Sequence, residues 1–185
     1  MLGAVLTTLG LATFVSKPAT LAVLGATLLL AWPIGRRLAE RSRCPRAVAI
    51  AFIITVGVIL ALTLTPNLPM NGADPLPPHY LSLLKHDPAA LWAEFTSSPL
   101  DAEQIANIAL YLPVGLLGVL TWRSAVRATV FGAALTIAVE TCQYGIIGRA
   151  GSLTDIRNNT AGAILGALFA AAARRYGKRR SAGSK

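Results

Sequence analysis

Polar and small residues between positions 140 and 166 stand out because the sequence around them is almost entirely apolar. They are Glu140, Gln143, Arg149, Asp155, Asn159, Gly162 and Gly166. Carboxylates accept hydrogen bonds or exchange protons, a guanidinium binds phosphate or carboxylate, and side-chain amides both donate and accept. So many such groups in a short apolar stretch predict the functional part of the chain.

The surroundings of these residues follow from the composition of the whole chain. Of 185 residues, 54% are hydrophobic and 14% are charged, and the mean hydropathy is +0.58. These values exceed what a soluble domain needs, so they indicate an integral membrane protein whose main partner is the lipid bilayer.

The apolar runs have the length of membrane-spanning helices, which need about 20 residues. We expect an all-α, polytopic transmembrane bundle that forms a single domain over residues 1–185, with five spans at about 19–34, 47–65, 105–122, 129–147 and 159–173. Residues 2–15 form a shorter apolar segment that ends at Lys17-Pro18. This segment is a candidate sixth span, or a re-entrant or interfacial segment, and we expect it to stay in the mature protein.

The basic residues predict the orientation. Most of the 17 Lys and Arg fall in residues 36–46, 123–127 and 174–185, whereas the intervening segments hold most of the acids. The positive-inside rule places the basic clusters and the C-terminus in the cytoplasm. The same clustering explains the net charge of +9, so we do not expect nucleic-acid binding.

The outer segment 66–104 is rich in proline and too short for an independent domain. Asp87-Pro88 resembles a helix N-cap followed by proline, which predicts a short interfacial helix, and Asp101 resembles the cap of the third span. His79 and His86 are seven positions apart, a spacing that fits no common zinc motif, so we expect no metal and no cofactor.

The third span carries one polar and small stripe. Asn107, Tyr111 and Gly115 recur every four residues, so they share a face that should point at protein. Pro113 removes one backbone hydrogen bond from the same helix. An asparagine at the end of a span can also be only a helix cap.

The fourth and fifth spans supply the remaining groups. Glu140 lies roughly 10 Å below the outer end of its span, so its carboxylate must be protonated or paired, and Arg149 is the nearest cation in sequence. Asp155 is placed to cap the next helix or to put a negative charge near its N-terminus. In that helix Asn159, Gly162 and Gly166 form a close-packing face. The topology brings six candidate ligand-binding residues near the outer surface: Asn107, Glu140, Gln143, Arg149, Asp155 and Asn159.

These motifs resemble the VanZ-like family of membrane proteins. The family pattern has Asn-x5-Pro-x-Gly in one span, met here from Asn107 to Gly115, and Glu-x2-Gln-x5-Arg-x5-Asp-Ile-x2-Asn-x2-Gly-x3-Gly across the next two, met from Glu140 to Gly166. The similarity covers residues 103–170, and Tyr111 stands where the family usually has Phe. The resemblance implies an envelope protein of the bacterial cytoplasmic membrane, in a family named for an accessory protein of teicoplanin resistance.

Three classes of function fit this sequence. The first is a non-enzymatic outer-leaflet site that binds a polar or lipid-linked envelope ligand, such as a cell-wall precursor or a glycopeptide. The second is an intramembrane enzyme with Glu140 or Asp155 as acid or base, although no Ser–His or Cys–His pair is evident and no catalytic residue is assigned. The third is a structural scaffold in which the polar residues only connect helices to one another. A homo-oligomer is also compatible with this sequence.

Overall fold

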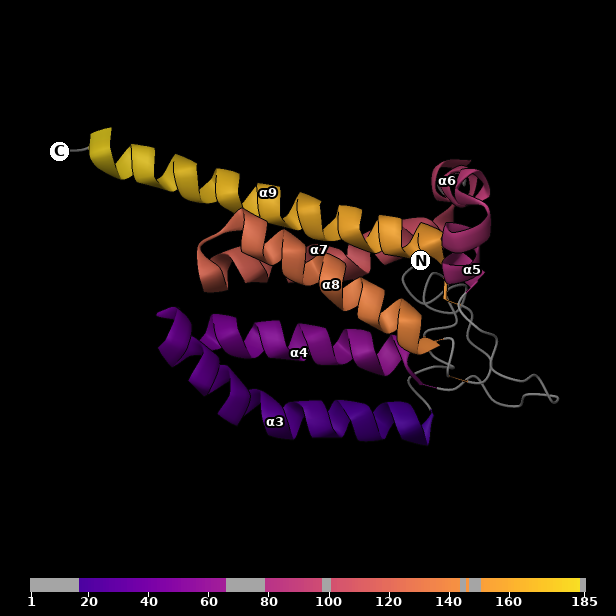
Figure 1. Cartoon of the computed structure of the whole chain (residues 1–185). Coiled ribbons are helices and arrows are strands. Elements are labelled where there is room, and N and C mark those ends of the chain that lie inside the picture. Colours follow the sequence, from indigo (N-terminus) through magenta and orange to yellow (C-terminus); the bar gives the residue numbers. More distant parts are fainter. Residues whose placement is uncertain (1–16, 66–78, 98–100, 144–145, 147–150, 184–185) are drawn as a thin grey trace.

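The computed structural model describes residues 17–65, 79–97, 101–143, 146 and 151–183. Regular secondary structure within these residues is entirely α-helical, which confirms the predicted fold class. The helices are α3 (Pro18–Ser42), α4 (Arg46–Thr63), α5 (His79–His86), α6 (Pro88–Ser97), α7 (Ala102–Trp122), α8 (Ala125–Gln143) and α9 (Leu153–Gly183). Figure 1 shows the five long helices side by side in one bundle, with α5 and α6 at one end. The predicted segment 2–15 lies outside the described residues.

Within the described part of the chain, α3, α4, α7 and α8 are long and apolar enough to cross a membrane. The apolar stretch of α9, by contrast, lies between polar residues from Asp155 to Asn159 at one end and Arg174 at the other. It nevertheless runs beside α7 along the length of the bundle (Figure 1). The fifth span therefore stays a prediction, whereas the multi-pass helical architecture is established.

Helix α3 extends beyond its predicted end. The apolar run predicted a span to residue 34 and a basic loop after it, but the helix continues through Pro33 to Ser42. The residues that follow the proline include good helix formers with no break until Arg43, which has a left-handed backbone. The arginines at 36, 37 and 41 therefore lie on the helix and not in a loop. In Figure 1 α3 changes direction part-way along, as expected for a helix with an internal proline.

Helix α9 is also longer than the apolar run that predicted it. Span 159–173 is embedded in a helix that runs from Leu153 to Gly183, so the basic C-terminal segment expected as a tail is largely helical. Hydropathy finds the part of a helix that is in lipid, not the polar turns that extend it. At its far end, Arg174 Nη1 donates to the backbone oxygen of Val119 in α7 at 3.2 Å.

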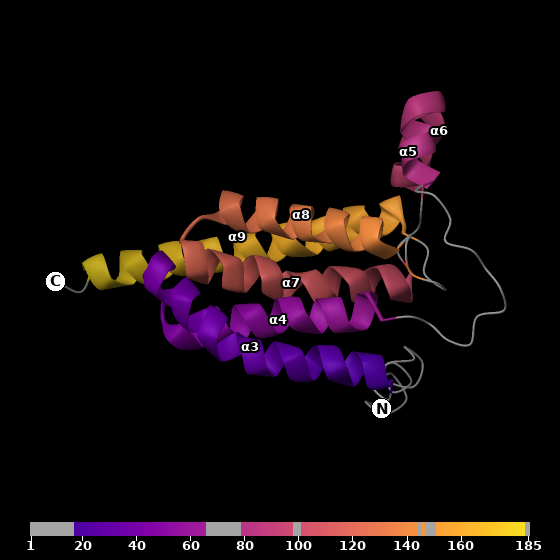
Figure 2. The same ribbon diagram turned by 60° about the horizontal axis from the view of Figure 1, so that its bottom comes forward.

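The outer segment holds two short helices where one was predicted. The Asp87 carboxylate accepts from the backbone N–H of Ala90 at 3.0 Å, which confirms the expected cap of α6. Asp101 likewise accepts from Gln104 N at 2.9 Å and begins α7. Helix α5 was missed because the prolines on both sides of it favoured a loop. Figure 2 shows that both short helices project from the end of the bundle.

Helix α7 is central to the bundle, since it contacts α9, α8 and α4. One buried cluster joins α4, α7 and α8 through Phe52, Ile59, Tyr111, Val114 and Val139. A second cluster joins α7, α8 and α9 through small residues: Val119, Ala128, Ala167 and Ala170. In contrast, α3 exposes much of its apolar surface, including Leu29 at 80%. That exposure suits a lipid-facing helix.

Candidate functional site

The candidate polar residues lie at the end of the bundle where α7 and α9 begin and where α4 and α8 end. Asn107 is on α7, Glu140 and Gln143 are on α8, and Asp155 and Asn159 are on α9. Arg149 lies outside the described residues. The structure thus groups these side chains on three helices around the N-terminus of α9, and it adds partners that the sequence did not indicate.

Asn107 and Asp155 connect α7 to α9 directly. The Asn107 amide Nδ2 donates to the Asp155 carboxylate Oδ1 at 2.7 Å, across 48 positions of sequence. Both residues are half-buried. The hydrogen bond is short for an amide donor, as expected when the acceptor is ionised. Asn107 is therefore more than a cap of its own helix.

The N-terminus of α9 is held by two helices at once. Ser152 caps it, because the Ser152 hydroxyl accepts from the backbone N–H of Asp155 at 3.3 Å. The backbone N–H of Ser152 in turn donates to Glu140 Oε2 at 2.9 Å. In a capping box, the acid three residues after the cap takes that N–H. Here Glu140 of α8 takes it, and the Asp155 carboxylate turns to Asn107 instead.

Two further pairs lie around this junction and join neighbouring helices. Gln143 Nε2 donates to the backbone oxygen of Thr63 at 3.2 Å, which satisfies one of the last carbonyls of α4. Asn159 Nδ2 donates to the Thr136 hydroxyl at 3.0 Å, which connects α9 to α8. Gln143, Asn159 and Thr136 are all buried. Both pairs keep polar groups satisfied away from water.

Some buried polar atoms at the junction have no hydrogen-bond partner among the described residues. They are the Tyr111 hydroxyl, Asn159 Oδ1, Asn158 Nδ2 and Gln104 Oε1. The Tyr111 hydroxyl lies near that of Thr136, without good hydrogen-bond geometry, and interacts electrostatically with Glu140 and Asp155. A buried polar atom without a partner costs free energy. The described side chains of the junction therefore leave hydrogen-bonding capacity unused.

The Asp155 carboxyl is electrostatically perturbed. Its pKa is raised from 3.8 to about 6: burial is the largest cause, the nearby carboxylates of Glu103 and Asp101 act in the same direction, and the Asn107 hydrogen bond opposes the change. Among the described residues, no cation pairs with it. Perturbed carboxyls of this kind are concentrated at functional sites, although structural networks produce them too.

Glycines bring the two helices that carry Asn107 and Asp155 into backbone contact. A Cβ added at Gly162 would lie 2.2 Å from the backbone oxygen of Ile108, and one at Gly166 would lie 2.0 Å from that of Leu112. A Cβ at Gly115 of α7 would lie 1.9 Å from the backbone oxygen of Ala163. Pro113 is half-buried within the same stretch of α7. This spacing fixes the register of α7 against α9, and hence the Asn107–Asp155 distance.

Arg157 joins the bundle to the short helix α6, a role that the sequence did not reveal. Its Nη1 donates to the backbone oxygen of Phe95 in α6 at 2.6 Å, and its Nε donates to Asn158 Oδ1 at 3.2 Å. The available signal was the position of Arg157 itself, a cation in the first turns of a helix near the expected outer surface. Ser152 and Thr136 were also missed, because serine and threonine do not stand out in an apolar sequence, and Thr63 was missed because it contributes only its backbone oxygen.

Comparison with known families agrees with this arrangement. The family model described as VanZ/LLP1 matches residues 52–174, which run from α4 to α9 and include every described site residue. The chain belongs to the VanZ/LLP1 family. The family match covers more of the chain than the motifs that suggested it, and it leaves out α3, which is the most lipid-exposed of the long helices. No curated protein and no solved structure matches the chain.

In this VanZ/LLP1-family membrane protein, the site offers carboxylates, amides and hydroxyls. No group of three or more His, Cys, Asp or Glu that could hold a metal occurs among the residues that the structure describes. The side chains present can accept hydrogen bonds from hydroxyl or amine groups and can donate through amides. This chemistry suits recognition of a polar group at the end of the bundle.

Proposed function

We propose that this VanZ/LLP1-family membrane protein binds a polar or lipid-linked envelope molecule at the junction around the N-terminus of α9. The Asn107–Asp155 pair carries the proposal. It presents a half-buried carboxylate that is desolvated enough to raise its pKa and is held by a neutral amide. Such a carboxylate gains free energy from a further donor, so an amine or a sugar hydroxyl is the favoured ligand group.

The charge around the pair supports the same ligand chemistry. Asp101 and Glu103 add negative charge beside Asp155, and two hydrogen bonds through Ser152 connect the Asp155 backbone to the buried Glu140. Arg149 would suit a phosphate or carboxylate of the same ligand. A lipid-linked cell-wall precursor, which carries both sugar and phosphate, would use both kinds of contact. We further propose that the ligand is bound in the outer leaflet and that its binding influences susceptibility to glycopeptides.

A specific observation also supports a scaffold role for part of the polar set. The Gln143–Thr63 and Asn159–Thr136 hydrogen bonds join helices and leave their donor groups satisfied by protein. We assign these two pairs to helix association. Asn107, Asp155 and Glu140 are assigned to the ligand, directly or by positioning.

Asp155→Asn separates the two roles, because the amide keeps the shape of the side chain and its oxygen can still accept from Asn107. We expect this variant to lose the envelope phenotype, measured as sensitivity to a glycopeptide and to detergent in cells that depend on the plasmid-borne protein. Folded yield and thermal stability in detergent should stay at least at the wild-type level. Asn107→Ala should also lose the phenotype, with a modest loss of stability.

Asn159→Leu is the matched control, since it removes the buried hydrogen bond from Asn159 to Thr136 and leaves the Asn107–Asp155 pair intact. Its phenotype should decline only in proportion to its folded yield. If Asp155→Asn retained the phenotype, or lost it only in proportion to folded protein, the binding function would be wrong and the scaffold role would remain.

A further inference from the structure

The end of the bundle opposite the polar junction contains a cavity that the proposed function does not use. Its volume is about 370 Å³, within the range of small-molecule sites, and α3, α4, α7 and α8 all contribute to its wall. Arg37 and Arg41 of α3 are exposed residues of its lining, and Leu38, Phe52, Trp122 and Phe131 are among its apolar lining residues. We refer to it as the arginine-rimmed pocket.

The apolar wall of the pocket is preformed by three aromatic rings. Phe52 and Trp122 meet edge to face with centroids 5.1 Å apart, and Phe131 packs 5.2 Å from Phe52 and 5.3 Å from Trp122. These rings come from three helices, so their mutual packing holds α4, α7 and α8 at fixed positions. A second cavity, of about 440 Å³, shares Trp122 and Phe131 and has Arg127 in its lining.

The pocket is continuous with surface that suits lipid tails. Val126 and Val130, in the lining of the second cavity, are 73% and 61% exposed. Exposed valines at this density on a helix that is apolar enough to cross a membrane indicate contact with acyl chains. An acyl chain can therefore reach the aromatic rings from the bilayer without crossing a polar barrier.

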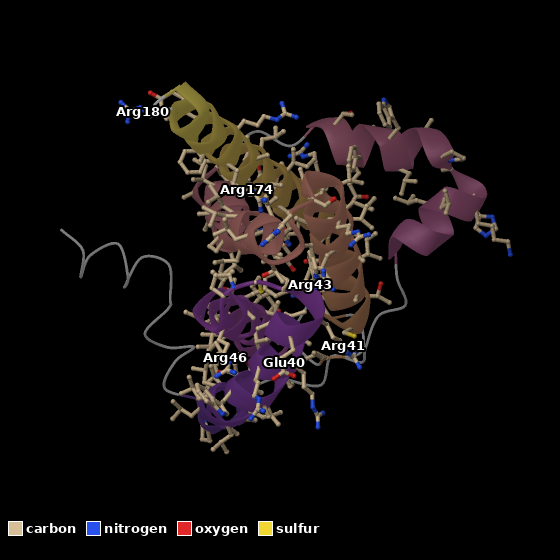
Figure 3. All side chains as sticks on the ribbon, turned by 90° about the vertical axis from the view of Figure 1, so that its left-hand side faces the viewer. Glu40, Arg41, Arg43, Arg46, Arg174 and Arg180 are labelled. Carbon is tan, nitrogen blue, oxygen red and sulfur yellow. The ribbon has the colours of Figure 1, made fainter. Side chains whose placement is uncertain are left out.

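The charge at the margin selects the headgroup. On α3, Glu40 forms an ion pair with Arg36 at 3.0 Å, and this is the acid nearest to the pocket on that helix. Among the described residues, no carboxylate pairs with Arg37, Arg41 or Arg127. Figure 3, which looks onto this end of the bundle, shows further arginines there: Arg43 just after α3, Arg46 of α4, and Arg174 and Arg180 of α9. The electrostatic potential at the margin is thus positive and unneutralised.

We propose that the arginine-rimmed pocket binds one anionic phospholipid, with an acyl chain against the three rings and the phosphate between Arg37 and Arg41. A guanidinium binds phosphate through two parallel N–H donors, which makes arginine pairs suitable for lipid headgroups. Basic pockets between transmembrane helices bind such headgroups in other membrane proteins. The site is independent of the polar junction, since it lies at the other end of the bundle and shares no residue with it.

Trp122 gives a direct test because it lies in the pocket wall. In a Trp32→Phe/Trp92→Phe variant, Trp122 is the single tryptophan, and its fluorescence is quenched by a lipid whose acyl chain carries bromine. The protein is placed in phosphatidylcholine vesicles with a small fraction of brominated phosphatidylglycerol or, separately, brominated phosphatidylcholine. Each arginine near an anionic lipid contributes about a fivefold preference, so the pair predicts that phosphatidylglycerol is preferred by roughly twentyfold.

Two double variants identify the arginines responsible. Arg37→Gln/Arg41→Gln should remove most of the preference, while Arg46→Gln/Arg175→Gln, which loses the same charge at the same end away from the pocket, should keep it. Equal quenching by the two lipids would overturn the proposal without any further variant. So would a preference that survives loss of Arg37 and Arg41, or one that both double variants lose equally, since that would reflect surface charge alone.

Discussion

At the start of α9, Glu140 replaces Asp155 as the acceptor of the capping residue's backbone N–H. This exchange leaves the Asp155 carboxylate available at the end of the bundle. Glu140 of α8 accepts from the N–H of Ser152, and the Asp155 side chain is thereby left to accept from Asn107 of α7. Three helices are joined through one helix terminus. A change in any of these residues should therefore move the others.

The stability of the protein should depend on pH through Asp155. Its pKa is about 6 in the folded protein, whereas an aspartic acid in water, as in the unfolded chain, has a pKa of 3.8. The folded protein therefore binds the proton more tightly than the unfolded chain does. Above about pH 6 the Asp155 carboxyl is ionised in the folded protein, and its burial lowers the free energy of unfolding. This loss of stability disappears as the pH falls through about 6 toward about 4. We expect the free energy of unfolding to rise by about 2–3 kcal/mol over that interval from this group.

Asp155→Asn imitates the protonated carboxyl, so it should be more stable than wild type at about pH 8 and equal to it at about pH 4. Thermal unfolding in detergent of both proteins across this range measures the difference. A constant difference between the two proteins would show that Asp155 is not the titrating group.

The sequence singled out the polar residues but not their partners. Polar side chains are easy to recognise in an apolar span, and that is why Gln143 and Asn159 could be selected without a structure. Their partners, the Thr63 carbonyl and the Thr136 hydroxyl, depend on the axial position of one helix against another. That position is set by packing across the interface, which no local pattern contains.

At the scale of helices, hydropathy predicted the five long helices and underestimated the lengths of α3 and α9. α3 and α9 both extend into sequence that is charged, because arginine, alanine and leucine have high helix propensity whether or not lipid surrounds them. Span boundaries mark where the surroundings change, whereas helix boundaries depend on caps and on left-handed residues such as Arg43. The two boundaries coincide at the end of α7, at Trp122, where Arg123 takes a left-handed backbone.

The contact between α7 and α9 predicts a sharp difference among glycines. Gly162→Ala should cost several kcal/mol and lower the folded yield, since the new methyl group would meet the backbone oxygen of Ile108. Gly177 is the matched control, because a Cβ there meets nothing within 4 Å and alanine is a better helix former than glycine. Gly177→Ala should be neutral or stabilise by up to about 1 kcal/mol. Equal thermal stability of the two variants in detergent would contradict the described packing.

At the scale of the molecule, the bundle has two chemically different ends. One end holds carboxylates, amides and the short helices α5 and α6 (Figure 1). The other end holds the arginines labelled in Figure 3 and the aromatic rings of the arginine-rimmed pocket. The positive-inside rule predicts that the arginine-rich end faces the cytoplasm. The polar junction would then face outward, where envelope ligands occur.

Labelling with a membrane-impermeant maleimide tests this orientation. In a Cys44→Ser/Cys142→Ser background, Ser82→Cys on α5 should react in intact cells, and Arg175→Cys on α9 should react only after permeabilisation. Both positions are exposed, so accessibility within the protein does not distinguish them. The reverse result would place the polar junction in the cytoplasm and exclude an outer-leaflet ligand.

The glycine contact between α7 and α9 also has a consequence for the order in which the protein is made. α7 leaves the ribosome long before α9, yet the most extensive interface of α7 is with α9. Until α9 arrives, the close-packing face of α7 around Gly115 has no permanent neighbour. α9 is less apolar than the four helices that are clearly long and apolar enough to span. The face of α7 around Gly115 fits α9 within van der Waals distance. We therefore expect α9 to enter the bilayer by docking onto α7, so that insertion of α9 and completion of the polar junction are a single event.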